Sequence, residues 1–360
     1  MNPRNILVIR FSSLGDVVLT SLLVRCLRKA CPNARIDMLT REPYGGILEG
    51  FGGLDHRLTL PSKGRSGREM INSLIKVGYD TVIDLQNHVK SRMLTASLRA
   101  PRVIRFRRSR VRRWLRIKFP LLRERLSPSP EVPVGYLQAA QTLGVTDDGA
   151  GLKLEVVPEW ERDARELLQR GSPEPGLNNT QPALVIAPGS RHPTKIWPPE
   201  RWAEFLKGAY GLGYRNQVIL GDANDLGLAD RIKSEFRHPV ISLAGQTDLG
   251  QLVGLIARAG VLIASDSAPV HIAAAVGTPV VAIFGPTTPD LGFAPFRCKS
   301  RIAQIDDLEC RPCHPHGSKR CPRGHFKCMK NLTATAVLNQ LQEIAPVWSE
   351  AGTAAVATEC

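Results

Sequence analysis

Short apolar runs alternate with amphipathic segments along most of the chain, and this alternation occurs twice. In the first half the pattern predicts strands at 5–10, 34–40, 80–86 and 102–106, and helices at 16–30, 88–99 and 134–144. In the second half it predicts strands at 183–190, 216–222, 240–245, 261–267 and 279–285, and helices at 199–211, 226–236, 248–260, 269–277 and 333–346. Strands that alternate with helices are typical of βαβ units, in which the strands form a parallel sheet.

The two halves are separated by a polar segment rich in glycine and proline, "GSPEPGLNNTQP" at 171–182, which is typical of a linker. We therefore expect one Rossmann-like domain over 1–170 and a second over 183–330, followed by a helix at 331–347. The small residues of 348–360 predict a disordered tail. Two such domains imply a cleft between them, and ligands of open parallel sheets bind beyond the carboxyl ends of the strands.

Composition places the chain among soluble globular proteins. It has 360 residues, enough for two domains, and 43% of them are hydrophobic. The apolar stretch near the N-terminus is short and is interrupted by Arg10, so it does not resemble a signal peptide. No run of about 18 apolar residues predicts a membrane-spanning helix. We expect a cytoplasmic protein.

The formal net charge of +15 is concentrated in residues 99–125, which contain eleven Arg and one Lys against the single acid Glu124. Such a cluster attracts phosphates or carboxylates, as in nucleic acids, anionic lipids or acidic sugars. Trp114, Phe106 and Phe119 lie among the arginines, which suits a membrane surface as well as it suits RNA. The alternative interpretation is a solvated basic face.

The segment "IRFSSLGDVVLTS" at 9–21 follows the first predicted strand and begins the first predicted helix. It resembles a nucleotide-binding turn, but it has one glycine, Gly15, and an acid, Asp16, in place of the G-x-G-x-x-G pattern. A carboxylate at this position does not favour phosphate binding. Asp16 can cap its helix, and a second carboxylate oxygen can accept a proton.

A second motif, "ASDSAPVHIAAAVGTPVVAIFG" at 264–285, runs from a strand into a small-residue helix. Asp266 and Ser267 can cap this helix, and Pro269 suits its first turn. Alternatively the free N–H groups of the helix start bind a pyrophosphate. His271 is either a core histidine or a donor to the ligand.

A third motif, "APGSRHPTKIWPPERW" at 187–202, places Arg191, His192 and Lys195 in a loop after a strand. A fixed cation at such a place can neutralise a departing phosphate. The alternative is that Lys195 is an ordinary surface lysine.

A segment at 310–328 contains Cys310, Cys313, Cys321 and Cys328. C-x2-C followed by two further cysteines suggests a tetrahedral metal site, but the C-x6-C spacing of the second pair is not a standard one. Reduced structural thiols or a redox-sensitive pair are the alternatives. Three nearby histidines leave the ligand set open.

Together these motifs resemble glycosyltransferase family 9, the lipopolysaccharide heptosyltransferases, over most of the chain from Ile6 to about Pro346. The resemblance rests on the order and spacing of the three motifs, beginning with "ILVIRFSSLGDVVLTSLLVRCLRKACPNARIDMLT". It implies an α/β GT-B fold, in which two Rossmann-like domains with parallel sheets face a central cleft. It also implies transfer of a heptose from ADP-heptose to the lipopolysaccharide inner core, with inversion at the anomeric carbon.

The resemblance implies roles for individual residues. Asp16 takes the place of the general base that deprotonates the acceptor hydroxyl. The donor-binding positions fall on Ser190, Lys195, Asp266, Ser267, Ala268, Pro269 and His271. The family does not generally require a catalytic metal, which implies a structural role for the four cysteines.

The sequence departs from the family at three places. Ala268 replaces the usual glycine, and Arg10 stands where many members have lysine. The acid expected to hold the nucleotide after the strand at 216–222 is matched only loosely, by Asp222 or Asp225.

The resemblance also implies partners for the chain: a nucleotide-sugar donor and an acidic, lipid-anchored acceptor at the cytoplasmic face of the inner membrane. The arginine-rich segment 99–125 then suits both the acidic sugar and a peripheral contact with the membrane surface. Two alternatives remain at this point. One is a family member with another nucleotide-sugar donor or another glycan or protein acceptor, and the other is a nucleic-acid-binding protein, although no RNP, KH or helix-turn-helix signature supports it.

Overall fold

The computed structural model describes residues 3–61, 65–119, 125–171 and 182–345. Almost all of the predicted linker at 171–182, and the whole predicted tail at 348–360, lie outside the described residues. The chain divides into two compact units. Unit 1 comprises Met1–Val157, Ala274–Val276 and Pro289–Arg297, and unit 2 comprises Pro158–Ala273, Gly277–Thr288 and Cys298–Cys360.

Unit 1 contains a five-stranded sheet in the order β3-β2-β1-β4-β5, and every pair of neighbouring strands in it is parallel. Its strands are β1 (Asn5–Ile9), β2 (Arg35–Arg41), β3 (His56–Leu60), β4 (Thr81–Asp84) and β5 (Arg102–Arg105). The chain moves outward from β1 to β3 and then returns to add β4 on the other side of β1. The gap between β1 and β4 is therefore the topological switch point of this sheet, where ligands of such folds bind.

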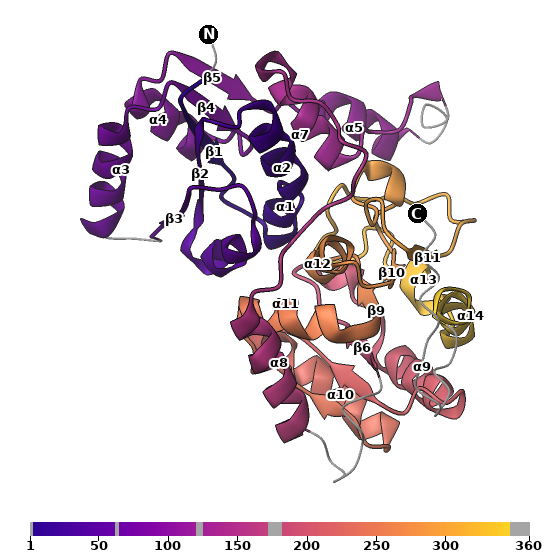
Figure 1. The fold of residues 1–360 in the computed structure, drawn as a ribbon. Coiled ribbons are helices and arrows are strands. Elements are labelled where there is room, and N and C mark those ends of the chain that lie inside the picture. The colour runs from indigo at the N-terminus through magenta and orange to yellow at the C-terminus, as the bar shows by residue number, and fades with distance from the viewer. Residues whose placement is uncertain (1–2, 62–64, 120–124, 172–181, 346–360) are drawn as a thin grey trace. The chain divides into compact units, whose positions relative to one another are not determined.

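Helices cover both faces of this sheet. They are α1 (Leu14–Val18), α2 (Ser21–Ala30), α3 (Arg65–Val77), α4 (Val89–Leu98), α5 (Arg110–Lys118) and α7 (Val132–Ala140), with the 3-10 helices η1 (Glu42–Gly50), η2 (Gln141–Leu143) and η5 (Pro289–Leu291). Figure 1 shows α3 and α4 on one side of the strands and α1, α2 and α7 on the other. Leu74 of α3 and Leu94 of α4 share one apolar core with alternate residues of β1, Leu7 and Ile9.

Unit 2 contains a six-stranded parallel sheet in the order β11-β10-β9-β6-β7-β8. Its strands are β6 (Ala183–Ala187), β7 (Gln217–Ile219), β8 (Ile241–Ser242), β9 (Ala259–Ser265), β10 (Val280–Ile283) and β11 (Ser300–Ala303). By the same reasoning, the switch point of this sheet lies between β6 and β9.

The helices of unit 2 are α8 (Pro158–Gly171), α9 (Pro199–Gly211), α10 (Leu226–Phe236), α11 (Leu249–Arg258), α12 (Ala268–Val276, whose last turn is counted in unit 1), α13 (Lys327–Lys330) and α14 (Ala334–Ile344), with η3 (Pro193–Lys195) and η4 (Ala223–Asp225). One of its apolar cores joins α9, α10 and α14 to Leu184 and Ile186 of β6 and to Val261 and Ile263 of β9. These positions alternate along each strand, as expected where alternate side chains face opposite layers of helices. Within the described part of the chain, no helix is both long and apolar enough to span a membrane.

The observed boundary between the two units differs from the predicted one, which ended the first domain at residue 170. The structure places the boundary after Val157, so α8 belongs to unit 2. The reason is close packing of α8 on α11, because a Cβ on Gly250 would lie 2.3 Å from Nε1 of Trp160, and one on Gly254 would lie 2.2 Å from its carbonyl oxygen. Only glycines at these positions allow the two helices to come so close.

Every strand predicted from the sequence is present, but other elements differ. The helix predicted at 16–30 is divided into α1 and α2 around Thr20. The prediction missed β3, α3, α5, α8, β11 and α13. Strand β3 is partly exposed along its length, so it lacks the continuous apolar run of a central parallel strand.

Candidate active site

The predicted site residues lie at the switch points of the two sheets, in two separate groups. Asp16 follows β1 in unit 1. In unit 2, Ser190 and Lys195 follow β6, and Asp266 directly follows β9. Each group thus lies at the carboxyl ends of the two strands that flank its own switch point, which is where side chains can reach a ligand in this class of fold.

Asp16 caps helix α1 with one of its carboxylate oxygens. The backbone N–H of Ser13 and the Ser13 hydroxyl both donate to Oδ2 of Asp16, at 3.1 and 2.9 Å. The other oxygen, Oδ1, lies 2.8 Å from Nη2 of Arg10. Both side chains are largely buried. The capping role foreseen from the sequence is therefore present.

The surroundings of Asp16 keep it ionised. Burial alone would raise its pKa, but the ion pair with Arg10 and the hydrogen bonds from Ser13 have the larger combined effect, so the pKa is lowered. Each carboxylate oxygen can accept about two hydrogen bonds. Among the described residues Oδ2 has two donors and Oδ1 has one, which leaves Oδ1 able to accept a proton.

A network from β4 holds the turn that carries Asp16. Oε1 of Gln86 accepts hydrogen bonds from the N–H groups of Phe11 and Ser12, at 3.1 and 3.3 Å. Gln86 is fixed in turn by Asp84, which is fully buried and whose Oδ1 accepts its N–H at 3.1 Å. Nη1 of Arg10 donates to the Leu85 carbonyl at 2.7 Å. The two strands beside the switch point therefore fix the position of Asp16 together.

In unit 2, Lys195 and Asp266 form an ion pair. Nζ of Lys195 lies 2.7 Å from Oδ2 of Asp266 and donates to the Asp266 carbonyl at 3.1 Å. Asp266 also accepts a hydrogen bond from the hydroxyl of Thr287 at 2.6 Å. An ammonium group has three N–H donors, so one donor of Lys195 remains available after these two contacts in the described residues. The surface-lysine alternative is wrong, since only 12% of the Lys195 side chain is exposed.

The other predicted donor residues lie on the same two segments as this pair, the loop after β6 and the start of α12. Oγ of Ser190 accepts the N–H of His192 at 3.4 Å. Ser267 is the N-cap of α12 but its hydroxyl donates to the Ser265 carbonyl at 3.0 Å, so within the described residues it does not cap the helix N–H groups. Ala268 and Pro269, both partly exposed, form the first turn of α12. His271 lies on the same helix and is 4% exposed.

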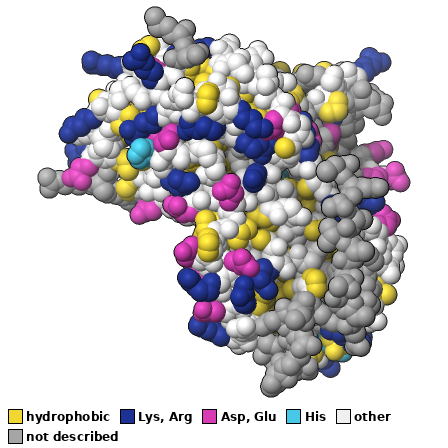
Figure 2. All heavy atoms as spheres, in the orientation of Figure 1, with side chains coloured by type: hydrophobic (Ala, Val, Ile, Leu, Met, Phe, Trp, Pro, Cys, Tyr) yellow, Lys and Arg dark blue, Asp and Glu magenta, His cyan; other side chains and the backbone are white. Residues whose placement is uncertain are grey.

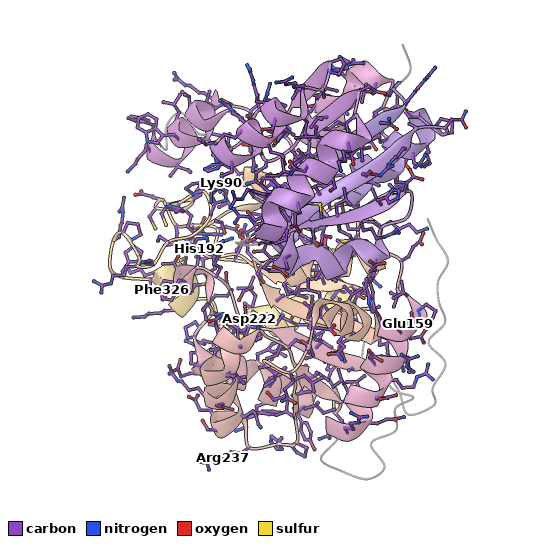
Figure 3. The ribbon with its side chains drawn as sticks, turned by 90° about the vertical axis from the view of Figure 1, so that its left-hand side faces the viewer. Lys90, Glu159, His192, Asp222, Arg237 and Phe326 are labelled. Carbon is purple, nitrogen blue, oxygen red and sulfur yellow. The ribbon has the colours of Figure 1, made fainter. Side chains whose placement is uncertain are left out.

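Of the two acids that loosely matched a nucleotide-binding position, Asp225 lies nearer to this loop. A Cβ on Gly189 would lie 2.2 Å from both carboxylate oxygens of Asp225, so the carboxylate lies directly against the backbone beside Ser190. Burial raises the pKa of Asp225. Figure 3 shows His192 and Asp222 at one end of unit 2 and Arg237, which follows α10, at the opposite end.

The cysteine-rich segment 310–328 contains free thiols, as all described cysteines do. Within the described residues, no group of three or more His, Cys, Asp or Glu side chains is arranged to hold a metal ion. Sγ of Cys310 lies 3.8 Å from Nε2 of His325. Burial raises the pKa of Cys328 to about 12 and also raises that of Cys313. Without a bound cation, these two thiols are therefore protonated at neutral pH.

The same segment contacts the loop that carries Lys195. The hydroxyl of Thr194 donates to the Ser318 carbonyl at 2.9 Å, and the Ser318 N–H donates to that hydroxyl at 2.8 Å. Gly317 has φ +85°, and a Cβ there would lie 2.8 Å from Cβ of His192 and 3.1 Å from Cγ of Lys195. The cysteine-rich segment thus fixes the backbone on which Lys195 is mounted.

Comparison with known proteins identifies the chain. A model of glycosyltransferase family 9 (heptosyltransferase) matches residues 68–322. The chain belongs to glycosyltransferase family 9. Lipooligosaccharide heptosyltransferase 2 of Haemophilus influenzae is 26% identical to it over 353 residues, which cover 94% of this chain and 99% of that protein. Lipopolysaccharide heptosyltransferase 3 of Escherichia coli is 29% identical over 289 residues, which cover 76% and 80% of the two chains.

Two solved structures of the family have the same fold. A family 9 glycosyltransferase from Veillonella parvula superposes with a TM-score of 0.77 at 24% identity, covering 95% of this chain and 97% of that one. ADP-heptose lipopolysaccharide heptosyltransferase II of E. coli gives a TM-score of 0.72 at 24% identity, covering 95% and 98%. The predicted fold of two Rossmann-like, parallel-sheet domains, GT-B, is confirmed, and so is the prediction of a glycosyltransferase. None of these four relatives supports the nucleic-acid-binding alternative.

The sequence interpretation missed the residues that position the catalytic candidates. It noted Arg10 only as a departure from the family and did not pair it with Asp16. It also missed Gln86, Thr287 and the contact between Thr194 and Ser318. The sequence contained one signal for Gln86. This polar residue ends the apolar run "VIDLQ", at the edge of the sheet where Asp16 also lies.

Proposed function

We propose that the protein is an inverting glycosyltransferase that transfers a heptose from ADP-heptose to the inner core of lipopolysaccharide. The acceptor is inferred from two heptosyltransferases of lipooligosaccharide and lipopolysaccharide, which the chain matches over 99% and 80% of their lengths, and the donor from the ADP-heptose heptosyltransferase II of E. coli. The chemistry rests on one observation, the ionised carboxylate of Asp16, whose Oδ1 can accept a proton.

In the proposed reaction Oδ1 of Asp16 takes the proton of the acceptor hydroxyl. The hydroxyl oxygen forms a bond to the anomeric carbon of the heptose while the bond from that carbon to the ADP oxygen breaks on the opposite face, which inverts the configuration. A carboxylate with a lowered pKa is a weak base but is already deprotonated, so its contribution comes from its position. Arg10 orients Oδ1 and keeps it ionised.

The departing ADP gains negative charge, and we assign its stabilisation to unit 2. The third N–H donor of Lys195 and the N–H of Ala268 at the start of α12, neither of which has a further partner among the described residues, are available to its phosphates. Ser190, Asp266, Ser267, Ala268, Pro269 and His271 are proposed to complete the donor site. No metal cofactor is part of this proposal, so turnover should persist in a chelator.

The acceptor in this proposal is acidic and lipid-anchored, so the enzyme acts at the cytoplasmic face of the inner membrane as a peripheral protein. The cationic surplus of residues 99–125 supports such a contact.

The test is an assay of the purified protein with ADP-heptose and defined truncated core acceptors, with products measured by mass. A mass increase of one heptose supports the proposal. Turnover with a different nucleotide-sugar and none with ADP-heptose would replace it with the alternative of another donor.

A further inference from the structure

Helix α5 in unit 1 has an unusual distribution of side chains. A surface helix normally buries its apolar face and exposes its charges. In α5, Arg116 is 4% exposed, whereas Val111 and Trp114 are 70% and 52% exposed. Phe119, which follows the helix, is 46% exposed, and its ring contacts that of Trp114 edge to face at a centroid distance of 5.7 Å. Although Leu115 and Ile117 are half-buried as usual, the helix thus buries one charged side chain and exposes two apolar ones.

The buried side of α5 is held by charge. The guanidinium of Arg116 forms an ion pair with Asp290 and donates to the Leu126 carbonyl. Arg108, just before the helix, binds the Leu291 carbonyl and lies over the ring of Phe293, 4.6 Å from its centroid. These two arginines are used inside unit 1. They attach α5 to the segment 289–297 with its apolar stripe outward.

The exposed apolar side chains lie on one side of the helix. Val111 and Trp114 are three residues apart, and Lys118, four residues further on, ends this side with a cation. Exposed cations flank the stripe in the sequence at Arg105, Arg107, Lys118 and Arg125. Figure 2 shows Lys and Arg side chains interspersed with Asp and Glu over much of unit 1, so cationic charge alone does not single out α5. The combination of aromatic and aliphatic side chains with cations does.

We propose that this face of α5, from Val111 to Phe119, is a membrane-docking surface that inserts Trp114 and Phe119 at the level of anionic lipid headgroups. Tryptophan is favoured at the boundary between headgroups and acyl chains, and helices with an apolar stripe and basic flanks lie in that plane. A stable protein interface buries roughly 1,200 Å² or more, which three exposed apolar side chains do not supply. A reversible lipid contact requires much less.

This inference rests on the proposed function in one respect: a lipid-anchored acceptor explains why the protein would contact a membrane. Binding to vesicles can be measured without turnover. The first experiment is co-sedimentation of the full-length protein with phosphatidylglycerol-containing vesicles and with phosphatidylcholine vesicles. We expect binding to the anionic vesicles, weakened at about 1 M salt, where the Debye length is about 3 Å. Trp114→Ala should lower the partition constant about tenfold, the effect of removing a large apolar side chain from the buried contact.

Two controls make the result specific. Leu226→Ala removes an apolar side chain of similar exposure, 45%, from unit 2 and should leave binding unchanged. Trp114→Phe should keep most of the binding but lower the fluorescence quenching by brominated lipids, because the other described tryptophans, Trp160, Trp197 and Trp202, are all buried. Equal vesicle binding by wild type and Trp114→Ala would overturn the proposal, as would preferential binding to a mixed-sequence RNA.

Turnover separates this inference from the proposed function. With an acceptor embedded in vesicles, Trp114→Ala should be slower than wild type, and with a deacylated, water-soluble acceptor the two should be equal. An equal loss with both acceptors would mean that α5 supports the fold or the site, which contradicts docking. If neither acceptor reacts, the proposed function fails while the vesicle experiment still decides on α5.

Discussion

Arg10 and Asp16 form an ion pair of 2.8 Å between the residue that follows β1 and the first turn of α1. The pair leaves the carboxylate ionised and mostly buried, and it directs one oxygen away from the helix cap. Capping and proton acceptance are thus divided between Oδ2 and Oδ1 of the same side chain. This division allows a structural and a chemical role for Asp16 to be measured separately.

Replacing Asp16 by asparagine should abolish the base and retain most of the cap. An amide oxygen can still accept from Ser13, so we expect a folded protein with ADP-heptose affinity within a few-fold of wild type. Turnover should fall by about 10²-fold or more, the usual contribution of a general base. Steady-state kinetics and calorimetric titration of the donor measure the two effects. Asp55→Asn, which breaks the 2.5 Å ion pair with Arg28 elsewhere in unit 1, is the matched control. If Asp16→Asn unfolds, or if it loses donor binding while turnover stays normal, then Asp16 only caps its helix and is not the base.

Arg10→Gln should shift the pH dependence of the reaction. The cation lowers the pKa of Asp16 against the raising effect of burial, so its removal raises that pKa. The active form is the carboxylate, and the acid limb of kcat/KM should therefore move to higher pH. The same ion pair affects stability. Because the pKa of Asp16 is lower in the folded than in the unfolded protein, ionised Asp16 stabilises the fold above the unfolded pKa, and this stabilisation is lost as the pH falls through the folded pKa. Acid unfolding of the variant should therefore begin at higher pH. An unchanged acid limb in the pH–rate profile would exclude Asp16 as the titrating group.

Lys195→Ala should weaken both donor binding and turnover, and it should also destabilise the protein by about 3 kcal/mol, because it leaves the buried carboxylate of Asp266 without its cation. Adding Asp266→Asn removes the unpaired charge. The double variant should recover much of the stability lost in urea unfolding but none of the lost ADP affinity. Lys207→Ala, an exposed lysine of the same unit, is the control. Recovery of ADP binding together with stability would show that Lys195 serves the fold and not the phosphates.

Thr194→Val should affect donor binding through the position of Lys195. Valine has the shape of threonine but cannot make the two hydrogen bonds with Ser318. We expect several-fold weaker ADP binding and a higher KM for the donor, with kcat changed less. Thr278 is also 4% exposed and donates to a backbone carbonyl, that of Ile256, so Thr278→Val controls for lost stability alone. Equal effects of the two variants on the donor KM would contradict a positioning role.

The architecture was predictable from the sequence because central parallel strands are buried on both faces and therefore appear as continuous apolar runs. All five residues of β6 are buried, for example, and the sequence predicted that strand directly. It did not predict α5, which exposes Val111 and Trp114 and buries Arg116, whose partner Asp290 is far away in the chain.

The candidate site residues were predictable from the sequence only where their position next to a predicted strand indicates their chemical role. Asp266 directly follows β9, and Asp16 and Lys195 lie in the turns after β1 and β6, so the rule about carboxyl ends found them. Their partners were not predictable, because Gln86 and Thr287 act through hydrogen bonds set by the order of strands in the sheets. That order is decided by packing across the whole unit.

The segment 289–297 lies in the chain between β10 and β11 of the second sheet, but it belongs to unit 1 and holds Arg108 and Arg116. A chimera that exchanges the N-terminal halves of two relatives at Val157 would therefore separate these arginines from the acid and carbonyls with which they evolved. A transplant of intact unit 1 between family members should therefore need residues 289–297 together with 1–157. Unit 1 is a single compact body encoded in pieces that are distant in the sequence.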